Sequence, residues 1–79
     1  MGRGSRKRPK YLAKKLRQVR LNLGWTQAQL AERMKLDSGT ISRFENDQRE
    51  PSLMELLQYA RLGNTTMEIL ADDKRKLSN

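Results

Sequence analysis

The chain has 79 residues and a net charge of +8, so it can form one small domain with a limited core. It contains no cysteine and no histidine, which excludes disulfide bonds and thiolate metal sites and removes the commonest general base of enzymes. No apolar run approaches the roughly 20 residues of a transmembrane helix, and no signal-peptide apolar segment follows the basic N-terminus. We therefore expect a cytoplasmic protein that is not an enzyme, with no metal, no cofactor, no membrane contact and no evident small-molecule ligand.

The positive charge is concentrated in the first part of the chain. Residues 1–31 contain nine Lys or Arg and no acidic residue, whereas residues 32–79 contain eight Lys or Arg and nine acidic residues. Such an uneven distribution indicates a polyanionic partner. Nucleic acid fits better than a membrane surface, because the basic segment lacks the large apolar face of an interfacial helix.

Residues 1–9 are predicted to be a disordered basic arm. Apart from Met1 and Pro9 they are Gly, Ser and cations, which offer little surface to bury. Such an arm can follow a phosphate backbone or enter a minor groove, although the same composition also suits a solubilising tail or an expression scar. The cations expected to take part are Arg3, Arg6, Lys7, Arg8 and Lys10.

Hydrophobic spacing predicts a first helix over residues 10–23. Apolar residues recur at steps of three and four from Leu12 to Leu23, which places them on one face of a helix. Gly24 follows at the usual stop position. The polar residues that lie off this apolar face are Lys14, Lys15, Arg17 and Gln18.

Two short helices joined by a tight turn are predicted within residues 25–45. Thr26 can cap the first of them, and Gln29 completes a capping box, while Asp37 can cap the second. The side chains left on the outward face of the second helix are Ser38, Gly39, Ser42 and Arg43. Because this face is short, small and polar, it fits a DNA major groove about 12 Å wide.

Two more helices are predicted after a loop. Ser52 and Glu55 form a capping box that begins a helix ending at Gly63. Thr65 with Glu68 predicts the start of a short fifth helix in the same way.

The predicted fold class is therefore all-α, with five helices in one domain. No strand pattern, internal repeat or linker interrupts residues 10–71, and the core is one layer of packed apolar helix faces. Residues 72–79 carry no helical pattern and are predicted to be a frayed C-terminal tail.

Several short motifs occur at fixed spacing within this domain. They are Leu16-x-x-Val19-Arg20, Gly24-Trp25-Thr26-Gln27-x-x-Leu30-Ala31, Ile41-Ser42-Arg43-Phe44-Glu45 and Pro51-Ser52. Together they resemble the Cro/phage-repressor type of helix-turn-helix, also called the xenobiotic-response-element family, over about residues 10–71. The resemblance implies a repressor-like five-helix bundle whose second and third helices form the helix-turn-helix and bind double-stranded DNA.

The resemblance also implies roles for individual residues. The implied DNA-base contacts are Ser38, Gly39, Ser42 and Arg43. The implied DNA-phosphate contacts are Gln27, Thr40, Asn46 and Arg49. The family pairs an arginine of the first helix with a glutamate after the third, here Arg20 and Glu45. An arginine such as Arg43 can donate two hydrogen bonds to guanine, whereas Gly39 offers no side chain. Without DNA contacts, Gln27 and Arg43 would be ordinary solvated side chains.

Three features depart from the family pattern. The turn between the second and third helices usually has glycine where this chain has Lys35, which implies either about 1 kcal/mol of left-handed strain or a variant turn. Asp47 replaces a second glycine. The segment 60–63 ends the fourth helix one residue early, which leaves the packing of the fifth helix open.

The residues and the resemblance together predict a transcription repressor that binds a specific double-stranded DNA sequence and is associated with the nucleoid. One reading helix contacts few base pairs, so we expect a homodimer on a palindromic site with half-sites about one helical turn apart. The fifth helix and the tail are the expected dimer surface. The alternative is an antitoxin or another protein-interaction module with the same fold, in which DNA binding is secondary. An outward face with Arg43 and no acid beyond Asp37 argues against that alternative.

Overall fold

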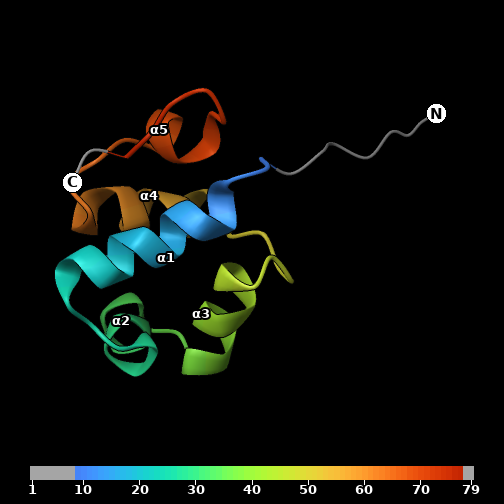
Figure 1. Cartoon of the computed structure of the whole chain (residues 1–79). Helices are drawn as coiled ribbons and strands as arrows, with labels where there is room; N and C mark the ends of the chain where they lie inside the picture. Colours follow the sequence, from blue (N-terminus) through green and yellow to red (C-terminus); the bar gives the residue numbers. More distant parts are fainter. Residues whose placement is uncertain (1–8, 78–79) are drawn as a thin grey trace.

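The computed structural model describes residues 9–77, and this part of the chain contains five α-helices (Figure 1). They are α1 (Leu12–Leu23), α2 (Gln27–Met34), α3 (Ser38–Glu45), α4 (Leu53–Leu62) and α5 (Met67–Ala71). No strand occurs among the described residues, so the all-α fold class with five helices is confirmed. The arm residues outside the described range are Arg3, Arg6, Lys7 and Arg8.

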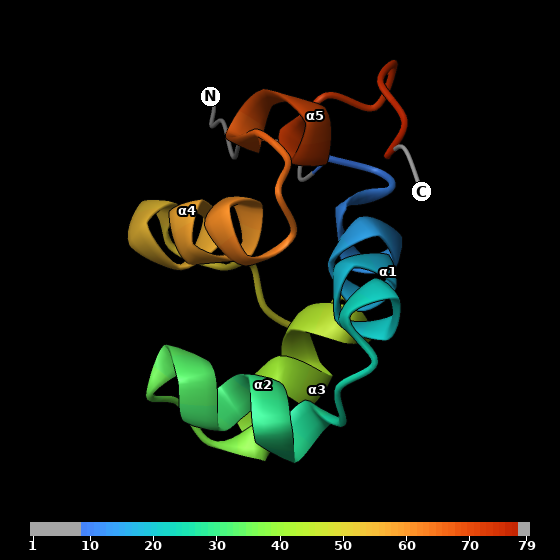
Figure 2. The same cartoon turned by 90° about the vertical axis from the view of Figure 1, so that its left-hand side faces the viewer.

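The helix α1 lies at the centre of the arrangement. It packs against α3, α4 and α5, whereas α2 packs mainly against α3 (Figures 1 and 2). The pair α2–α3 therefore forms one end of the molecule, and α5 lies at the other end. The helix begins two residues later than predicted, because Lys10 and Tyr11 form a turn before it.

One hydrophobic core contains residues from all five helices. Its buried members are Leu12, Leu16, Val19, Leu30, Ala31, Met34, Ile41, Phe44, Tyr59, Ala60 and Leu70. Phe44 of α3 meets Tyr59 of α4 edge to face, with the ring centroids 6.2 Å apart and the ring planes at 67°. Burial raises the pKa of Tyr59, and its hydroxyl has no hydrogen-bond partner among the described residues.

Capping boxes begin α2 and α4 where the sequence predicts them. The hydroxyl of Thr26 accepts a hydrogen bond from the N–H of Gln29, and the Gln29 side chain accepts one from the N–H of Thr26. Ser52 and Glu55 exchange the same two bonds. Both boxes satisfy N–H groups that the first helical turn leaves without partners.

The cap of α5 is Thr66, one residue after the predicted Thr65. The hydroxyl of Thr66 accepts a hydrogen bond from the N–H of Ile69 at 3.1 Å. The N–H of Thr65 instead donates to the carbonyl of Ala60 at 2.9 Å, which closes the end of α4. The prediction was wrong because Thr65 completes the preceding helix and cannot also begin the next one.

The turn between α2 and α3 keeps its regular geometry without glycine. Lys35 has φ 59° and ψ 40°, in the left-handed region, and the N–H of Leu36 donates to the carbonyl of Ala31 at 2.8 Å. Asp47 also has a positive φ, of 58°. A left-handed lysine costs roughly 1 kcal/mol, so the chain accepts this strain and does not adopt a variant turn.

Residues 72–77 are attached to the start of α1 and do not fray. The carboxylate of Asp73 accepts hydrogen bonds from the N–H groups of Lys10, at 2.8 Å, and Tyr11, at 3.0 Å. The start of α1 has no cap from its own residues, so Asp73 satisfies N–H groups that would otherwise lack a partner. Leu77 packs against the core. The prediction of fraying was wrong for these residues, because local patterning does not reveal a partner 62 or 63 positions away.

Lys15 makes the reciprocal contact at the end of α5. Its Nζ donates hydrogen bonds to the carbonyls of Ile69 and Asp72, each at 2.7 Å, and the residue is 8% exposed. Helical spacing places Lys15 off the apolar face, yet the structure buries it, because α5 covers this part of α1 and its last carbonyls favour a cation. We call the hydrogen bonds of Lys15 and Asp73 the α1–α5 clasp.

Candidate nucleic-acid interface

The four residues predicted to contact bases share the outer face of α3. Ser38, Gly39 and Arg43 are exposed, and Ser42 is half-buried. A Cβ atom added at Gly39 would stand 3.9 Å from Nη1 of Arg43, so the guanidinium lies back along the helix over the glycine. The face therefore carries one long cation on a surface of small residues.

Asp37 caps α3 and engages Thr40 twice. Its Oδ1 accepts hydrogen bonds from the N–H of Thr40 at 2.7 Å and from the Thr40 hydroxyl at 2.9 Å. These bonds lower the pKa of Asp37, and the positive charges of Arg43 and Arg49 lower it further. Thr40 is only 6% exposed. The Thr40 hydroxyl thus donates within the cap, and the phosphate contact expected of Thr40 stays a prediction.

Arg20 and Glu45 form the expected pair beneath α3. Arg20 Nε donates to Glu45 Oε2 at 2.7 Å, and Arg20 Nη2 donates to Glu45 Oε1 at 3.0 Å. A third bond runs from Arg20 Nη1 to the carbonyl of Trp25 at 2.9 Å. The two side chains are 11% and 3% exposed, and the hydrogen bond to Glu45 raises the pKa of Arg20. The pair thus joins α1, the start of α2 and the end of α3.

Gln27, a predicted phosphate contact, belongs to the same network. It is the first residue of α2, is half-buried, and donates through Nε2 to Glu45 Oε1 at 3.2 Å. Glu45 therefore orients both the helix that carries Gln27 and the helix that carries Arg43. The sequence assigned Gln27 a DNA role from the resemblance but did not predict this bond.

Asn46 and Arg49 lie just after α3, and both are exposed. The Asn46 side chain donates to the hydroxyl of Ser42 at 3.1 Å. The guanidinium of Arg49 lies 5.8 Å from the centroid of the Phe44 ring, an aromatic contact that limits its movement. Both predicted phosphate contacts are therefore held close to the end of α3.

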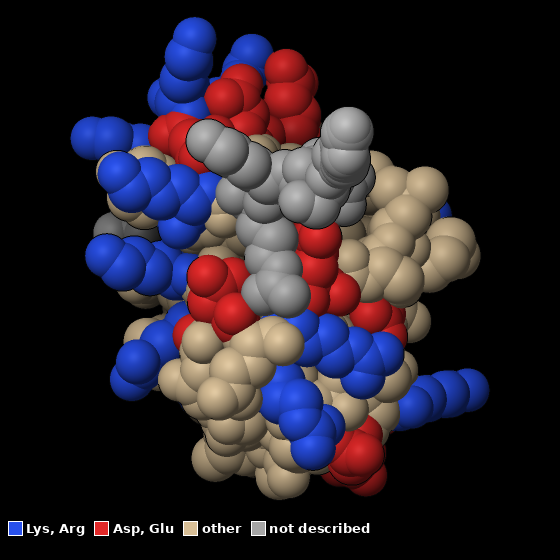
Figure 3. Space-filling model, turned by 90° about the vertical axis from the view of Figure 1, so that its right-hand side faces the viewer, with Lys and Arg blue, Asp and Glu red and all other residues tan. Residues whose placement is uncertain are grey.

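The exposed cations of α1 and of the turn before it form a second positive surface. Lys15 and Arg20 are used inside the fold, whereas Lys10, Lys14 and Arg17 are exposed. Figure 3 shows Lys and Arg side chains in a column along one edge of the molecule, with Asp and Glu side chains beside it. Lys14 and Arg17 were not predicted as site residues, although their spacing of three on a helix signals a shared face.

The described residues contain no group of three or more His, Cys, Asp or Glu that could hold a metal ion. Within the same range, no helix has the length and apolar character needed to cross a membrane.

The chain belongs to the helix-turn-helix family of the Cro/phage-repressor type, whose family model matches residues 16–70. It is 32% identical over 59 residues to the HTH-type transcriptional regulator ImmR of Bacillus subtilis, covering 75% of this chain and 46% of ImmR. It is 37% identical over 60 residues to antitoxin HipB of Escherichia coli K12, covering 72% of this chain and 68% of HipB. The chain thus spans about half the length of ImmR and about two thirds of HipB.

Solved structures share the fold. The P22 c2 repressor protein in complex with synthetic operator 9T matches with a TM-score of 0.72 and 22% identity, covering 78% of this chain and 94% of that one. A HipB variant in an O2 20-mer complex matches with a TM-score of 0.59 and 29% identity, covering 82% of this chain and 90% of that one.

Proposed function

We propose that this protein is a sequence-specific, double-stranded-DNA-binding regulator of transcription that acts as a repressor. The observation that carries the proposal is the outer face of α3, where Arg43 lies on small polar residues above the Arg20–Glu45 pair. A guanidinium on such a face can donate two hydrogen bonds to O6 and N7 of guanine in the major groove. The similarity to the transcriptional regulator ImmR supports the same function.

In this mechanism the outer face of α3 reads the bases and its neighbours contact the backbone. Arg43 supplies most of the discrimination, with Ser38 and Ser42 as weaker contacts and Gly39 permitting close approach. The phosphate contacts are Gln27, Asn46 and Arg49. The start of α2 also presents backbone N–H groups, which favour an anion at that position.

The cations of α1 and of the N-terminal segment supply affinity that does not depend on sequence. Lys10, Lys14 and Arg17 are exposed, and each phosphate that they neutralise releases condensed counterions from the DNA. The protein needs no catalytic group for this role, and it acts in the cytoplasm, on the nucleoid.

The proposed active form is a homodimer on a palindromic site. A single copy of α3 reads only a few base pairs, which gives little specificity in a genome. Two copies related by a two-fold axis read two half-sites about one helical turn apart.

A second candidate function is that of an antitoxin. The 37% identity to antitoxin HipB favours it. In that case a protein partner is the main ligand and DNA binding is secondary.

Selection from random duplexes tests the first proposal. The wild-type protein should enrich a palindromic sequence, and its affinity should fall steeply as salt is raised, because several phosphates are neutralised. Absence of enrichment, or binding that does not respond to salt, would contradict DNA reading and favour the protein-interaction function.

A further inference from the structure

A hollow of about 490 Å³ lies between the start of α1 and the C-terminal segment. One wall contains Tyr11, Lys14 and Gln18, and the facing wall contains Arg75, Lys76 and Leu77. The two walls come from opposite ends of the described chain, so no local pattern in the sequence indicates the hollow. Small-molecule sites in proteins usually measure about 300–1,000 Å³, and this hollow falls within that range.

The α1–α5 clasp holds the two walls of the hollow together. The carboxylate of Asp73 accepts hydrogen bonds from two N–H groups just before α1, and Lys15 Nζ donates to two carbonyls at the end of α5. Four residues after Asp73, Leu77 packs against the core. These contacts form without a ligand, so the hollow is preformed and a ligand needs to order little of the chain when it binds.

The charged groups around the hollow favour an anion. Four cations and one carboxylate line it. The carboxylate, of Asp73, already accepts two hydrogen bonds, and the guanidinium of Arg75 lies 3.3 Å from one carboxylate and 3.8 Å from another. Lys14 and Lys76 are exposed and form no ion pair among the described residues. Their charges are therefore available to an anion in the hollow.

Lys15 adds a buried positive charge to the same wall. The residue is 8% exposed, and its Nζ donates to two backbone carbonyls, each at 2.7 Å. Carbonyl dipoles stabilise the ammonium group but do not neutralise its charge. A charge away from water is screened less than an exposed one, so Lys15 also attracts an anion in the hollow.

The rest of the surface of the hollow is mainly apolar. The ring of Tyr11 is 40% exposed, and Leu77 is half-buried. The aliphatic parts of the lysine side chains add to this apolar surface. A ring and a leucine can pack against a planar apolar group, which inorganic phosphate does not have. The hollow therefore suits an anion that also has a flat apolar part.

We propose that this hollow binds a small aromatic carboxylate, with its ring between Tyr11 and Leu77 and its carboxylate beside Lys14 and Lys76. The ring leaves water on binding, and the carboxylate gains two ion pairs at the rim. The buried charge of Lys15 adds to this attraction without a direct contact.

A titration of the ¹⁵N-labelled protein with 2-naphthoate, followed by NMR without DNA, tests the site. The amide signals of Tyr11, Lys14, Gln18 and residues 73–77 should shift and saturate, with a dissociation constant on the order of 1 mM. Two further probes separate the ring from the charge. The uncharged 2-naphthalenemethanol and inorganic phosphate should each bind at least about 5-fold more weakly, because each lacks one of the two parts.

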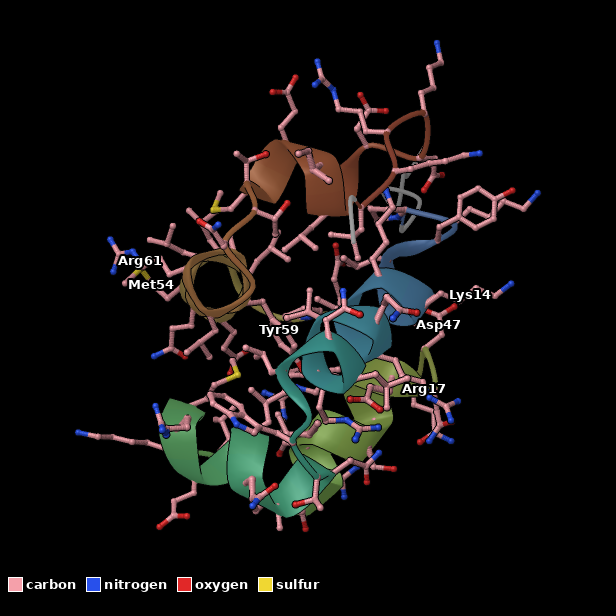
Figure 4. All side chains as sticks on the ribbon, turned by 60° about the vertical axis from the view of Figure 1, so that its left-hand side comes forward. Lys14, Arg17, Asp47, Met54, Tyr59 and Arg61 are labelled. Atoms are coloured by element: carbon pink, nitrogen blue, oxygen red, sulfur yellow. The ribbon has the colours of Figure 1, made fainter. Side chains whose placement is uncertain are left out.

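Variants test the residues that are expected to hold the ligand. Lys14→Gln with Lys76→Gln removes both unpaired cations, so the dissociation constant of 2-naphthoate should rise about 5-fold. The matched control is Lys35→Gln with Arg61→Gln, which removes two cations that do not line the hollow. Arg61 lies on the opposite side of the molecule from Lys14 (Figure 4). The control should bind 2-naphthoate like the wild type, and the NMR spectra should show that both variants are folded.

Three results would overturn the proposal. They are the absence of saturable shifts around the hollow, equal binding of 2-naphthoate and either of the other two probes, and equal binding by the two double variants. These titrations contain no DNA, so they decide the question whether or not the protein binds DNA.

A ligand in the hollow should also weaken DNA binding, and this consequence rests on the proposed function. Lys14 is one of the cations proposed to contact phosphates, so a bound carboxylate competes with DNA for its charge. Saturating 2-naphthoate should lower the affinity for duplex DNA about 3-fold relative to sodium chloride at the same ionic strength. Unchanged affinity would overturn this regulatory effect and leave the ligand site intact. A protein that binds 2-naphthoate but not DNA would contradict the proposed function alone.

Discussion

The outer faces of α3 and α4 are both exposed but carry different kinds of side chain. The face of α3 has two serines, a glycine and Arg43, whereas α4 has Leu53 and Met54. Small polar groups and a guanidinium exchange hydrogen bonds with base edges in a hydrated groove. Apolar side chains gain by leaving water, which a protein partner allows. The side chains on the outer face of α3 therefore favour nucleic acid as a ligand, and those of α4 do not.

The two faces also differ in what lies beneath them. Under α3 is the charged pair of Arg20 and Glu45, whereas α4 rests on the aromatic contact of Tyr59 with Phe44. A charged pair away from solvent is sensitive to the loss of one member, because the other keeps its desolvation cost. An aromatic contact tolerates changes that preserve its shape. We therefore expect mutations beneath α3 and mutations beneath α4 to change the stability of the protein by different amounts.

The largest effect is expected from Glu45→Ala. It leaves the Arg20 guanidinium, 11% exposed, without its carboxylate, and breaking such a pair costs about 3–5 kcal/mol. The free energy of unfolding, measured with urea, should fall by that amount, and DNA binding should weaken with it. The control is Glu68→Ala, which removes an exposed pair with Arg75 and should cost at most about 1 kcal/mol. Equal stability of the two variants would show that α3 does not depend on Glu45.

Arg43→Ala should remove base discrimination without unfolding the protein. A bidentate contact to guanine is worth about 1–3 kcal/mol, so preference at one position of each half-site should flatten in a selection from random duplexes. Met54→Ala, on the other face, should leave that preference unchanged. If Met54→Ala flattens it and Arg43→Ala does not, the roles of the two faces are reversed.

Tyr59→Phe should leave the protein equally stable or raise its stability by about 1 kcal/mol, because it removes a buried hydroxyl without a partner and keeps the ring. Urea unfolding measures the change. Phe44→Ala is the contrasting variant, since it deletes the ring and should cost about 3–5 kcal/mol. A clear loss of stability in Tyr59→Phe would mean that the hydroxyl has a hydrogen-bond partner in solution.

Neutralising the exposed cations of α1 should change the salt dependence of DNA binding. Each lost phosphate contact lowers the slope of log affinity against log salt by about 0.9, so Lys14→Gln with Arg17→Gln should lower it by up to about 2. Arg61→Gln, on the opposite side of the molecule, is the matched control and should leave the slope unchanged (Figure 4). Equal slopes for all three proteins would place the phosphate contacts elsewhere.

The smallest effect is expected from the α1–α5 clasp, and it depends on pH. Hydrogen bonds from Lys10 and Tyr11 lower the pKa of Asp73. A carboxyl group with a lowered folded pKa stabilises the protein above its unfolded pKa, about 3.9, and this contribution is lost as pH falls through the folded value. Thermal unfolding of Asp73→Asn should therefore depend less on pH below about 4 than that of the wild type. Identical pH profiles would show that the carboxylate adds nothing in solution.

The helix-turn-helix was predictable because its signals are local. Thr26 and Asp37 cap helices through N–H groups three residues away, and Lys35 occupies a turn that neighbouring hydrogen bonds define. For the same reason, helical spacing predicted which residues lie on the outer face of α3. The predicted cap of α5 was wrong by one residue, because the N–H of Thr65 donates to a carbonyl at the end of α4. The sequence did not show that the Thr40 hydroxyl donates to Asp37 within the cap, and its phosphate contact stays a prediction.

The sequence by itself determined the helix order, the turn and the positions that face outward from α3, because these depend on residues three or four apart. Only the tertiary structure decided which cations remain free, how residues 72–77 pack and which apolar side chains stay in solvent. Lys15 finds its acceptors 54 and 57 positions away, and Asp73 finds its donors 62 and 63 positions away. Such contacts follow from how whole helices pack. Helical spacing therefore cannot distinguish a solvated lysine from a buried lysine that caps another helix. The exposed face of α4 has the same origin, since it is what the core leaves uncovered.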